Sequence, residues 1–295
     1  MCIRDSVGGM RIAFQRNEGE CVFSSEWDRY SQKTYYKNFG DMPAGDITKI
    51  EAKDIPDHNI LIGGFPCQPF SSIGKREGFE HATQGTLFFD IVRILKEKKP
   101  ESFLLENVSG LKHHDKGNTL KQIMSTLRNE LGYWVELKEL DSADYGVPQH
   151  RKRIYIVGFN KAISNKTNFL FEWPAKHEKK VGIGQFVESH EDGYTISNHL
   201  QKSYIYKKDD GRPQVIDKNS DIQVKTLCST YHKIQRLTGT FVKDGKTGLR
   251  LLSHNECKAI MGFPKDFKFP VSRTCLLYTS PSPRDATLSR MPSSA

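Results

Sequence analysis

The fold of this chain is decided by the stretch Ile60-Leu61-Ile62-Gly63-Gly64-Phe65-Pro66-Cys67-Gln68-Pro69. Its apolar start predicts a short buried strand, and the two glycines predict a turn directly after it. Cys67 then lies between two prolines, which leave the backbone little conformational freedom. Such rigidity suits a nucleophile, because the sulfur must meet the reacting atom in one geometry. For Cys67 taken alone, a small buried apolar residue is the competing interpretation.

Short apolar runs alternate with helical patterns from about Gly8 to Phe159. The runs that predict strands are residues 20–24, 60–62, 103–105, 134–137 and 154–159. Between them, residues 87–95 and 120–127 carry apolar side chains at helical spacing. This alternation predicts an α/β fold with a doubly wound, mostly parallel sheet. Ligands of such sheets bind beyond the carboxyl ends of the strands, so we expect Cys67 and Glu106 to face one crevice.

The chain changes character after about Lys161. Residues 165–245 are polar and only weakly periodic, which predicts a smaller domain that is irregular or rich in short strands. Ser253 followed by Glu256 predicts a capping box at the start of a helix that runs through Ile260. We therefore expect a catalytic and cofactor-binding domain over 7–164, a second domain over 165–245 and a return segment over 246–274.

Composition restricts the class of protein. The 295 residues carry a formal net charge of +9, which favours a polyanionic partner. No run of 18 apolar residues and no secretion leader is found, so we expect a cytoplasmic protein without a membrane span. The six cysteines lack paired or metal-ligand spacing, and we expect neither a metal site nor a disulfide framework.

The two ends of the chain show no pattern that belongs to this fold. Met1–Ser6 has neither strand nor helix periodicity, and residues 275–295 are rich in Ser and Pro. Both segments resemble translated adapter sequence, with an ordinary disordered terminus as the alternative. We expect residues 1–6 and 275–295 to be non-native, and the first strand of the fold to be missing.

Two further segments carry candidate chemistry. Glu106 ends a predicted strand, where a carboxyl withdrawn from water can hold or donate a proton; an ordinary surface glutamate is the alternative. Arg151 and Arg153 lie two residues apart at the start of a strand, and hence on the same side. Paired guanidiniums can bind phosphate or a base carbonyl, whereas a solvated run of charges is the alternative.

Taken in order, three segments resemble the signature of the cytosine-5 DNA methyltransferases: Pro66-Cys67-Gln68, Glu106-Asn107-Val108 and Gln149-x-Arg151-x-Arg153. The further matches are Ser25-Glu26-Trp27-Asp28, Gly45-Asp46-Ile47, Gly85-Thr86-Leu87-Phe88-Phe89 with Arg93-Ile94, and Glu256-Cys257-x-x-Ile260-Met261-Gly262-Phe263-Pro264. The resemblance runs from about Val7 to Thr274. It implies a Rossmann-like methyltransferase with a smaller target-recognition domain, which methylates a cytosine flipped out of a short duplex DNA site.

The resemblance also implies roles for individual residues. Cys67 is expected to attack C6 of the cytosine, Glu106 to bind the N3 edge, and Arg153 to hold the O2 carbonyl. Arg151 is expected close to a backbone phosphate. The residues expected to hold S-adenosylmethionine are Gly9, Glu26, Trp27, Asp46, Ile47, Phe65 and Leu87. Those expected to contact DNA are Gln149, Thr226, Lys233, Gln235, Arg236 and Thr238.

We expect a monomeric enzyme that acts on duplex DNA, either alone or beside a restriction endonuclease that acts separately. Two alternatives stay open. Some relatives methylate tRNA, but those largely lack the recognition domain, whose position residues 165–245 fill here. The other alternative is an inactive DNA-binding remnant, because the glycine-rich first turn is reduced to Val7-Gly8-Gly9 and the family's final helix is not recognisable. We therefore expect the chain as written to be unstable or inactive.

Overall fold

A computed structural model describes residues 1–270 of the chain, apart from residue 4 and segments 66–86, 164–170, 190–192 and 229–230. The described residues form two compact units. The first comprises Met1–Glu139 and Arg153–Trp173, and the second comprises Leu140–Lys152 and residues 174–270. Each unit has a hydrophobic core of its own.

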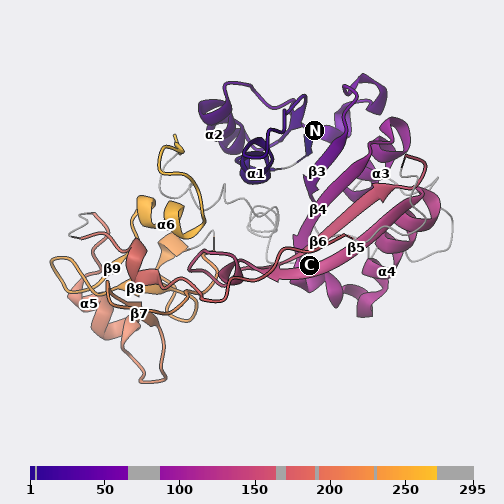
Figure 1. Ribbon diagram of the computed structural model, residues 1–295. Helices are drawn as coiled ribbons and strands as arrows, with labels where there is room; N and C mark the ends of the chain where they lie inside the picture. The colour runs from indigo at the N-terminus through magenta and orange to yellow at the C-terminus, as the bar shows by residue number, and fades with distance from the viewer. Residues whose placement is uncertain (4, 66–86, 164–170, 190–192, 229–230, 271–295) are drawn as a thin grey trace. The chain divides into compact units, whose positions relative to one another are not determined.

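The first unit is built on a six-stranded sheet with the strand order β2-β1-β3-β4-β6-β5 (Figure 1). The strands are Cys2–Ile3 (β1), Ser24–Ser25 (β2), Ile60–Gly64 (β3), Ser102–Val108 (β4), Tyr133–Asp141 (β5) and Lys152–Asn160 (β6). Strands β1 to β4 pair in parallel, and β6 pairs antiparallel with β4. The predicted α/β fold with a mostly parallel sheet is therefore confirmed.

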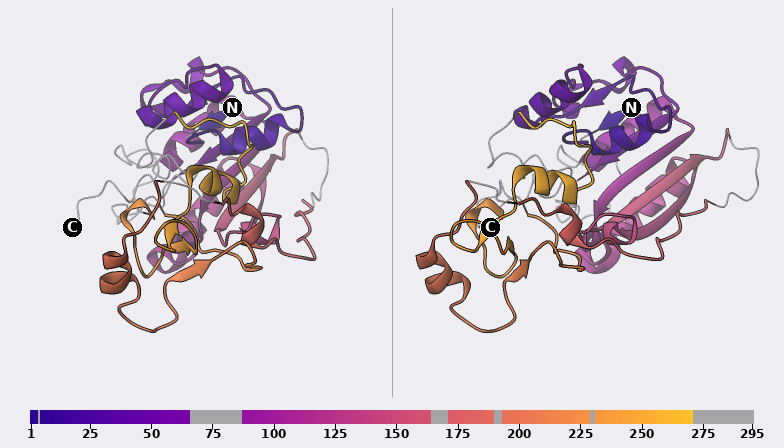
Figure 2. Two further views of the ribbon diagram at one scale, coloured as in Figure 1. Left: turned by 90° about the vertical axis from the view of Figure 1, so that its left-hand side faces the viewer. Right: turned by 60° about the vertical axis from the view of Figure 1, so that its left-hand side comes forward.

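Helices flank the sheet of the first unit. Helices α1 (Gly9–Gln15) and α2 (Arg29–Phe39) lie together on one side, away from α3 (Leu87–Lys98) and α4 (Asn118–Ser125), as Figures 1 and 2 show. Helix α3 buries Phe88, Ile91, Ile94 and Leu95, whose spacing places them on one face toward the core. Among the described helices, none is long and apolar enough to cross a membrane.

The first strand differs from the expectation. Strand β1 lies between β2 and β3, with Cys2 opposite both Ser24 and Ile62. Cys2 and Ile3 are buried, so the apolar start of the chain forms a strand inside the sheet, although the run is too short to give a strand pattern. The expectation of a missing first strand is therefore wrong. The foreign origin of residues 1–6 stays a prediction, and residues 275–295 lie outside the described part of the chain.

The second unit contains a small sheet with the order β7-β8-β9, formed by Gln214–Ile216, Thr240–Val242 and Arg250–Leu251. Its helices are α5 (Asn198–Leu200) and α6 (His254–Ile260), and long irregular segments connect these short elements (Figure 2). This unit also takes in Leu140–Lys152 and residues 246–270, which the sequence assigned elsewhere. The functional roles expected for the sequence ranges stay predictions.

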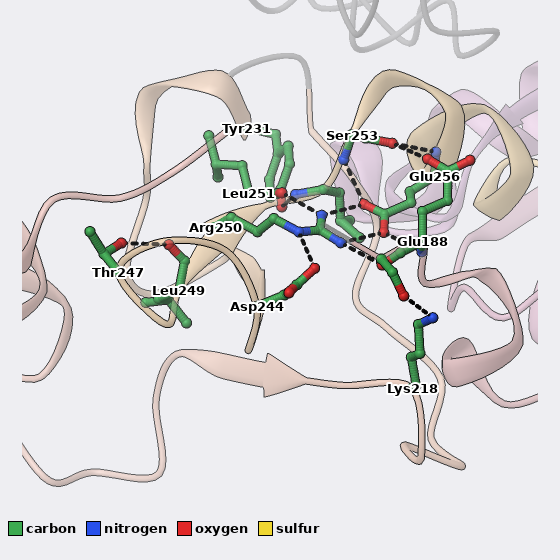
Figure 3. Close-up of polar contacts among 12 residues, drawn as sticks. Glu188, Lys218, Tyr231, Asp244, Thr247, Leu249, Arg250, Leu251, Ser253 and Glu256 are labelled. Carbon is green, nitrogen blue, oxygen red and sulfur yellow. Dashed lines mark hydrogen bonds and ion pairs between the residues drawn. The ribbon is translucent and has the colours of Figure 1, made fainter. Parts of the chain in front are cut away.

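A buried ionic network joins β9 to α6 (Figure 3). Arg250 is fully buried; its Nη1 and Nη2 donate to the two carboxylate oxygens of Glu256 at 2.8 and 2.9 Å, and its Nε lies 3.2 Å from Asp244. The Ser253 hydroxyl accepts from the Glu256 amide, and the Glu256 carboxylate accepts from the Ser253 amide. The predicted capping box is therefore confirmed.

Candidate active site

The carboxyl ends of β3 and β4 define one edge of the sheet in the first unit. Strand β3 ends at Gly64 and leads toward the predicted nucleophile Cys67, which itself lies outside the described residues. Strand β4 places Glu106 directly opposite Gly64. Because β6 runs antiparallel to β4, its first residues return to the same edge, where Arg153 lies opposite Val108. Segments far apart in the sequence thus meet where ligands of parallel sheets bind.

Glu106 and Arg153 form a buried ion pair at this edge. The Glu106 Oε1 and Arg153 Nε atoms are 2.9 Å apart, and the two side chains are 10% and 11% exposed. A carboxylate and a guanidinium that are both withdrawn from water each need an opposite charge, which this pairing supplies. The structure therefore brings two of the predicted site residues together as an ion pair.

Asn107 holds the backbone at Phe65, two residues before Cys67 in the sequence. Its side-chain amide nitrogen donates to the carbonyl oxygen of Phe65 at 2.8 Å, and its side-chain oxygen accepts from the Val108 amide at 2.8 Å. The Phe65 amide donates in turn to the carbonyl of Glu106 at 3.5 Å. Asn107 is buried, so these bonds are shielded from water. The sequence motif contained Asn107, but no role was assigned to it, because its partner is apparent only once β3 and β4 are paired.

The arrangement at this edge is suited to a polar heterocycle. Glu106 supplies a carboxyl, Arg153 supplies a planar guanidinium, and both are held by the sheet register. A ring that carries a nitrogen next to a carbonyl could be bound by the two groups together. Within the described ranges, no group of three His, Cys, Asp or Glu side chains could hold a metal ion.

Glu26 and Trp27 follow directly after β2. Glu26 is only 4% exposed, and its Oε1 accepts from the backbone amide of Asp28 at 2.9 Å. Trp27, in contrast, is 43% exposed. A buried carboxylate can accept hydrogen bonds from ribose hydroxyls, and an exposed indole can stack on a planar base. This pair of side chains at a strand end therefore fits the adenosine portion of S-adenosylmethionine.

The segment that contains Asp46 and Ile47 lies beside β2. The Ser25 hydroxyl donates to the carbonyl of Gly45 at 2.8 Å, which holds this segment against the strand. Asp46 caps the following turn, since its Oδ1 accepts from the amide and the hydroxyl of Thr48 at 3.1 and 2.9 Å. Ile47 is buried in the core. Both positions are thus next to the strand that carries Glu26, and their contacts with a cofactor stay predictions.

The other predicted cofactor residues lie at the starts of helices or in the core. Gly9 begins α1, and Leu87 begins α3. Phe65 is 1% exposed, and the centre of its ring is 5.5 Å from that of Phe88. The structure therefore places the Phe65 ring in the core against Phe88, and its contact with adenine stays a prediction.

In the second unit, Gln149 and Thr226 are brought together. The His150 amide donates to the carbonyl of Val224 at 2.8 Å, and the Thr226 hydroxyl donates to the carbonyl of His150 at 2.6 Å. Gln149 is 1% exposed, and its Nε2 has no hydrogen-bond partner among the described residues. A buried amide donor of this kind needs a partner from water or from a bound molecule. The segment is therefore a candidate contact for a substrate.

Asp141 holds the backbone at Arg151. The Arg151 amide donates to Asp141 Oδ1 at 2.9 Å, and His150 Nδ1 lies 2.9 Å from Asp141 Oδ2. Burial alone would raise the pKa of Asp141, but hydrogen bonds from His150 and from the amides of Ala143 and Arg151 lower it below its ordinary value. Asp141 therefore stays charged and fixes the start of the Arg151-x-Arg153 motif, a role that the sequence did not indicate.

The predicted DNA-reading residues differ in exposure. Lys233 and Thr238 are exposed, and the Thr238 hydroxyl donates to the Gln235 side chain at 2.9 Å. Arg236 is only 7% exposed, and its guanidinium donates to the carbonyl of Ile205. This placement differs from the expectation that Arg236 reads a base edge, because its donors point at its own chain.

Comparison with known proteins agrees with the motifs. The family model of the C-5 cytosine-specific DNA methylases matches residues 3–280. The chain is 60% identical over 268 residues to Type II methyltransferase M.MspI of Moraxella sp, covering 91% of this chain and 63% of that protein. It is 53% identical over 269 residues to Type II methyltransferase M.BsuFI of Bacillus subtilis, covering 91% and 64%. The chain thus spans less than two thirds of the length of these two relatives.

A solved structure shows the same fold. A mutant DNMT2 of Spodoptera frugiperda superimposes with a TM-score of 0.75, covering 98% of this chain and 96% of that chain. The two sequences are 18% identical, so this likeness concerns the fold alone. It confirms the Rossmann-like architecture that the sequence predicted.

Proposed function

Because the chain belongs to the C-5 cytosine-specific DNA methylase family, we propose that it transfers a methyl group from S-adenosylmethionine to C5 of a cytosine in duplex DNA. The main structural support for this proposal is the arrangement of Glu106, Arg153 and Asn107. The buried Glu106–Arg153 pair lies at the sheet edge where Asn107 holds Phe65, two residues before Cys67. This arrangement supplies the groups that a flipped cytosine requires next to a nucleophile.

Cys67 is the proposed nucleophile. C5 of cytosine is a poor nucleophile, so the thiolate first forms a bond with C6, and the ring electrons move toward C5. After C5 has gained the methyl group, loss of the C5 proton and breakage of the sulfur–C6 bond restore the aromatic ring and the thiolate. The sequence indicates no base for that proton, and water can accept it.

Glu106 and Arg153 are proposed to stabilise the ring during this attack. Glu106 is proposed to share a proton with N3 once the base has entered, and Arg153 binds the O2 carbonyl, where negative charge develops. Because the two side chains are buried and 2.9 Å apart, they are oriented before the base enters. Arg151 and the buried Nε2 of Gln149 are proposed to bind the DNA backbone beside the flipped nucleotide.

The cofactor is proposed to bind at the ends of β1 and β2. Glu26 would accept from the ribose hydroxyls, Trp27 would stack on the adenine, and Asp46 would bind the adenine amino group. Gly9 and Leu87 would line the same site. Bound S-adenosylmethionine supplies an electrophilic methyl group, and the chain's own residues orient it.

Duplex DNA is the proposed partner, bound at a short specific site by a monomer. The formal net charge of +9 favours a polyanion, and Lys233, Gln235 and Thr238 carry the side-chain types that read base edges in the major groove. We also propose that the enzyme is the modification partner of a restriction endonuclease that acts separately.

A methylation assay with tritiated S-adenosylmethionine tests this function. Duplex DNA and tRNA are offered in parallel, and we expect 5-methylcytosine in the DNA only. Label in tRNA alone would support the alternative of a tRNA methyltransferase. No label in either substrate, together with sequence-selective binding of DNA, would support an inactive DNA-binding protein.

A further inference from the structure

Arg236 lies at the centre of a loop formed by residues 205–212 in the second unit. Its Nε donates to the carbonyl of Ile205 at 2.9 Å. Its Nη2 donates to the carbonyls of Lys208 and Arg212 at 2.8 and 3.2 Å. Three backbone carbonyls of one loop thus converge on a single guanidinium, whose side chain is 9% exposed.

Asp210 binds the same guanidinium from within the loop. Its Oδ2 accepts from Arg236 Nη1 at 2.9 Å, and its Oδ1 contacts Arg236 Nη2. Two parallel contacts between a guanidinium and a carboxylate fix the planes of both groups relative to one another. The guanidinium of Arg236 holds the pKa of Asp210 below its usual range, which keeps the carboxylate charged. One side chain therefore determines the conformation of the loop.

The outer surface of this loop carries basic and aromatic side chains. Tyr206 is 52% exposed, and Lys207 and Lys208 are exposed beside it. Lysines attract phosphates, and an exposed aromatic ring adds a flat apolar contact, so this combination suits a nucleic acid. Leu237, which directly follows Arg236, is 55% exposed. Arg236 thus links the loop to the segment that contains Gln235 and Thr238.

We propose that Arg236 is a positioning residue for DNA recognition, which holds residues 205–212 as a DNA-contacting loop beside residues 235–238. The inference rests on the proposed function, because it takes duplex DNA as the partner. An ordered loop loses less conformational freedom when it binds, so holding the loop in place increases its affinity for the DNA site that it fits. Arg236 acts through the loop and does not read a base itself.

Selection from a pool of random-sequence DNA duplexes tests the proposal. The wild-type chain is expected to enrich a short motif. Arg236→Met and Asp210→Asn are each expected to reduce that enrichment by about tenfold or more, the effect of losing one good base contact. Arg236→Lys, which keeps the charge, should retain part of the enrichment. Hydrogen exchange of the amides in 205–212 should become faster in the first two variants.

Substitutions at exposed positions of the loop test the proposal even if Arg236→Met does not fold. Tyr206→Ala/Lys207→Ala is expected to weaken binding of the selected duplex, whereas the matched control Tyr36→Ala/Lys37→Ala on helix α2 should weaken it far less. Wild-type enrichment in both Arg236→Met and Asp210→Asn would overturn the proposal and leave the proposed function intact. Failure of the wild-type chain to enrich any sequence would overturn the proposed function, and this inference with it.

Discussion

At the scale of single residues, the main feature of the site is the burial of two opposite charges, Glu106 and Arg153, beside one another. Both side chains are about one-tenth exposed, and each charge offsets part of the cost of burying the other. The sequence motif indicated both residues separately. Their contact follows from the antiparallel register of β4 and β6, which no local pattern specifies.

Replacement of Glu106 tests this pairing. Glu106→Gln removes the carboxylate that lies 2.9 Å from Nε of the buried Arg153, so we expect a loss of about 3 kcal/mol in the free energy of unfolding. The rate of methyl transfer should fall by about 10²-fold or more, because a Gln amide cannot hold and transfer the proton at N3. Glu139→Gln is the matched control, since the Glu139–Lys112 pair at 3.2 Å is more exposed and should contribute less than about 1 kcal/mol. Equal losses in the two variants by urea unfolding would contradict the account.

Asp141 predicts a pH dependence of stability. Its pKa is lowered in the folded protein, so its contribution to stability is present above the ordinary value of 3.8 and is lost as the pH falls through the lowered pKa. The free energy of unfolding, measured with urea, should therefore differ less between about pH 6 and pH 3 in Asp141→Asn than in the wild-type chain. An unchanged difference would show that Asp141 is not bound as the structure shows.

Arg236 illustrates why the sequence predicted some site residues and not others. A polar loop with Lys233, Gln235 and Arg236 is typical of a surface that reads DNA, and two of these side chains are at least partly exposed. Nothing in that pattern indicates that residues 205–212 enclose the third. Arginines that read bases and arginines that organise a loop look alike until the fold brings distant carbonyls to them.

At the scale of elements, the sequence predicted best where apolar residues follow one another directly or recur at helical spacing. Strands β3, β4 and β6 and helix α3 lie where their patterns indicated. Helix α2 (Arg29–Phe39) was not predicted because its side chains are mostly polar; Asp28 caps its start, and Gly40 with a φ of 79° ends it. Strand β1 was also missed, which removes one reason for expecting an inactive chain.

The capping box of α6 predicts a measurable contribution to stability. Ser253→Ala removes the hydroxyl that accepts from the Glu256 amide and donates to the Glu188 carboxylate at 2.9 Å, so we expect a loss of about 1 kcal/mol or more. Ser197→Ala at the short helix α5 is the control, and its longer cap bond of 3.3 Å should contribute less. A larger loss in the control, by thermal or urea unfolding, would contradict the importance of this network.

At the scale of the whole molecule, the charge balance predicts how DNA binding responds to salt. A protein with a net charge of +9 that binds phosphates releases counterions from the DNA, so its affinity should fall linearly on a double-logarithmic plot against salt concentration. Fluorescence anisotropy with a labelled duplex would give the slope, which is about −0.9 for each phosphate contact. An affinity that does not change with salt would contradict DNA as the partner.

The proposed function depends on a covalent bond between the Cys67 sulfur and C6 of the cytosine. A duplex containing 5-fluorocytosine traps the intermediate, because the fluorine on C5 cannot leave as the proton does and the sulfur–C6 bond persists. We predict a complex of protein and DNA that survives denaturing electrophoresis, requires S-adenosylmethionine and is absent in Cys67→Ser. A wild-type chain that binds this DNA without forming the complex, or a Cys67→Ser variant that still forms it, would contradict the account.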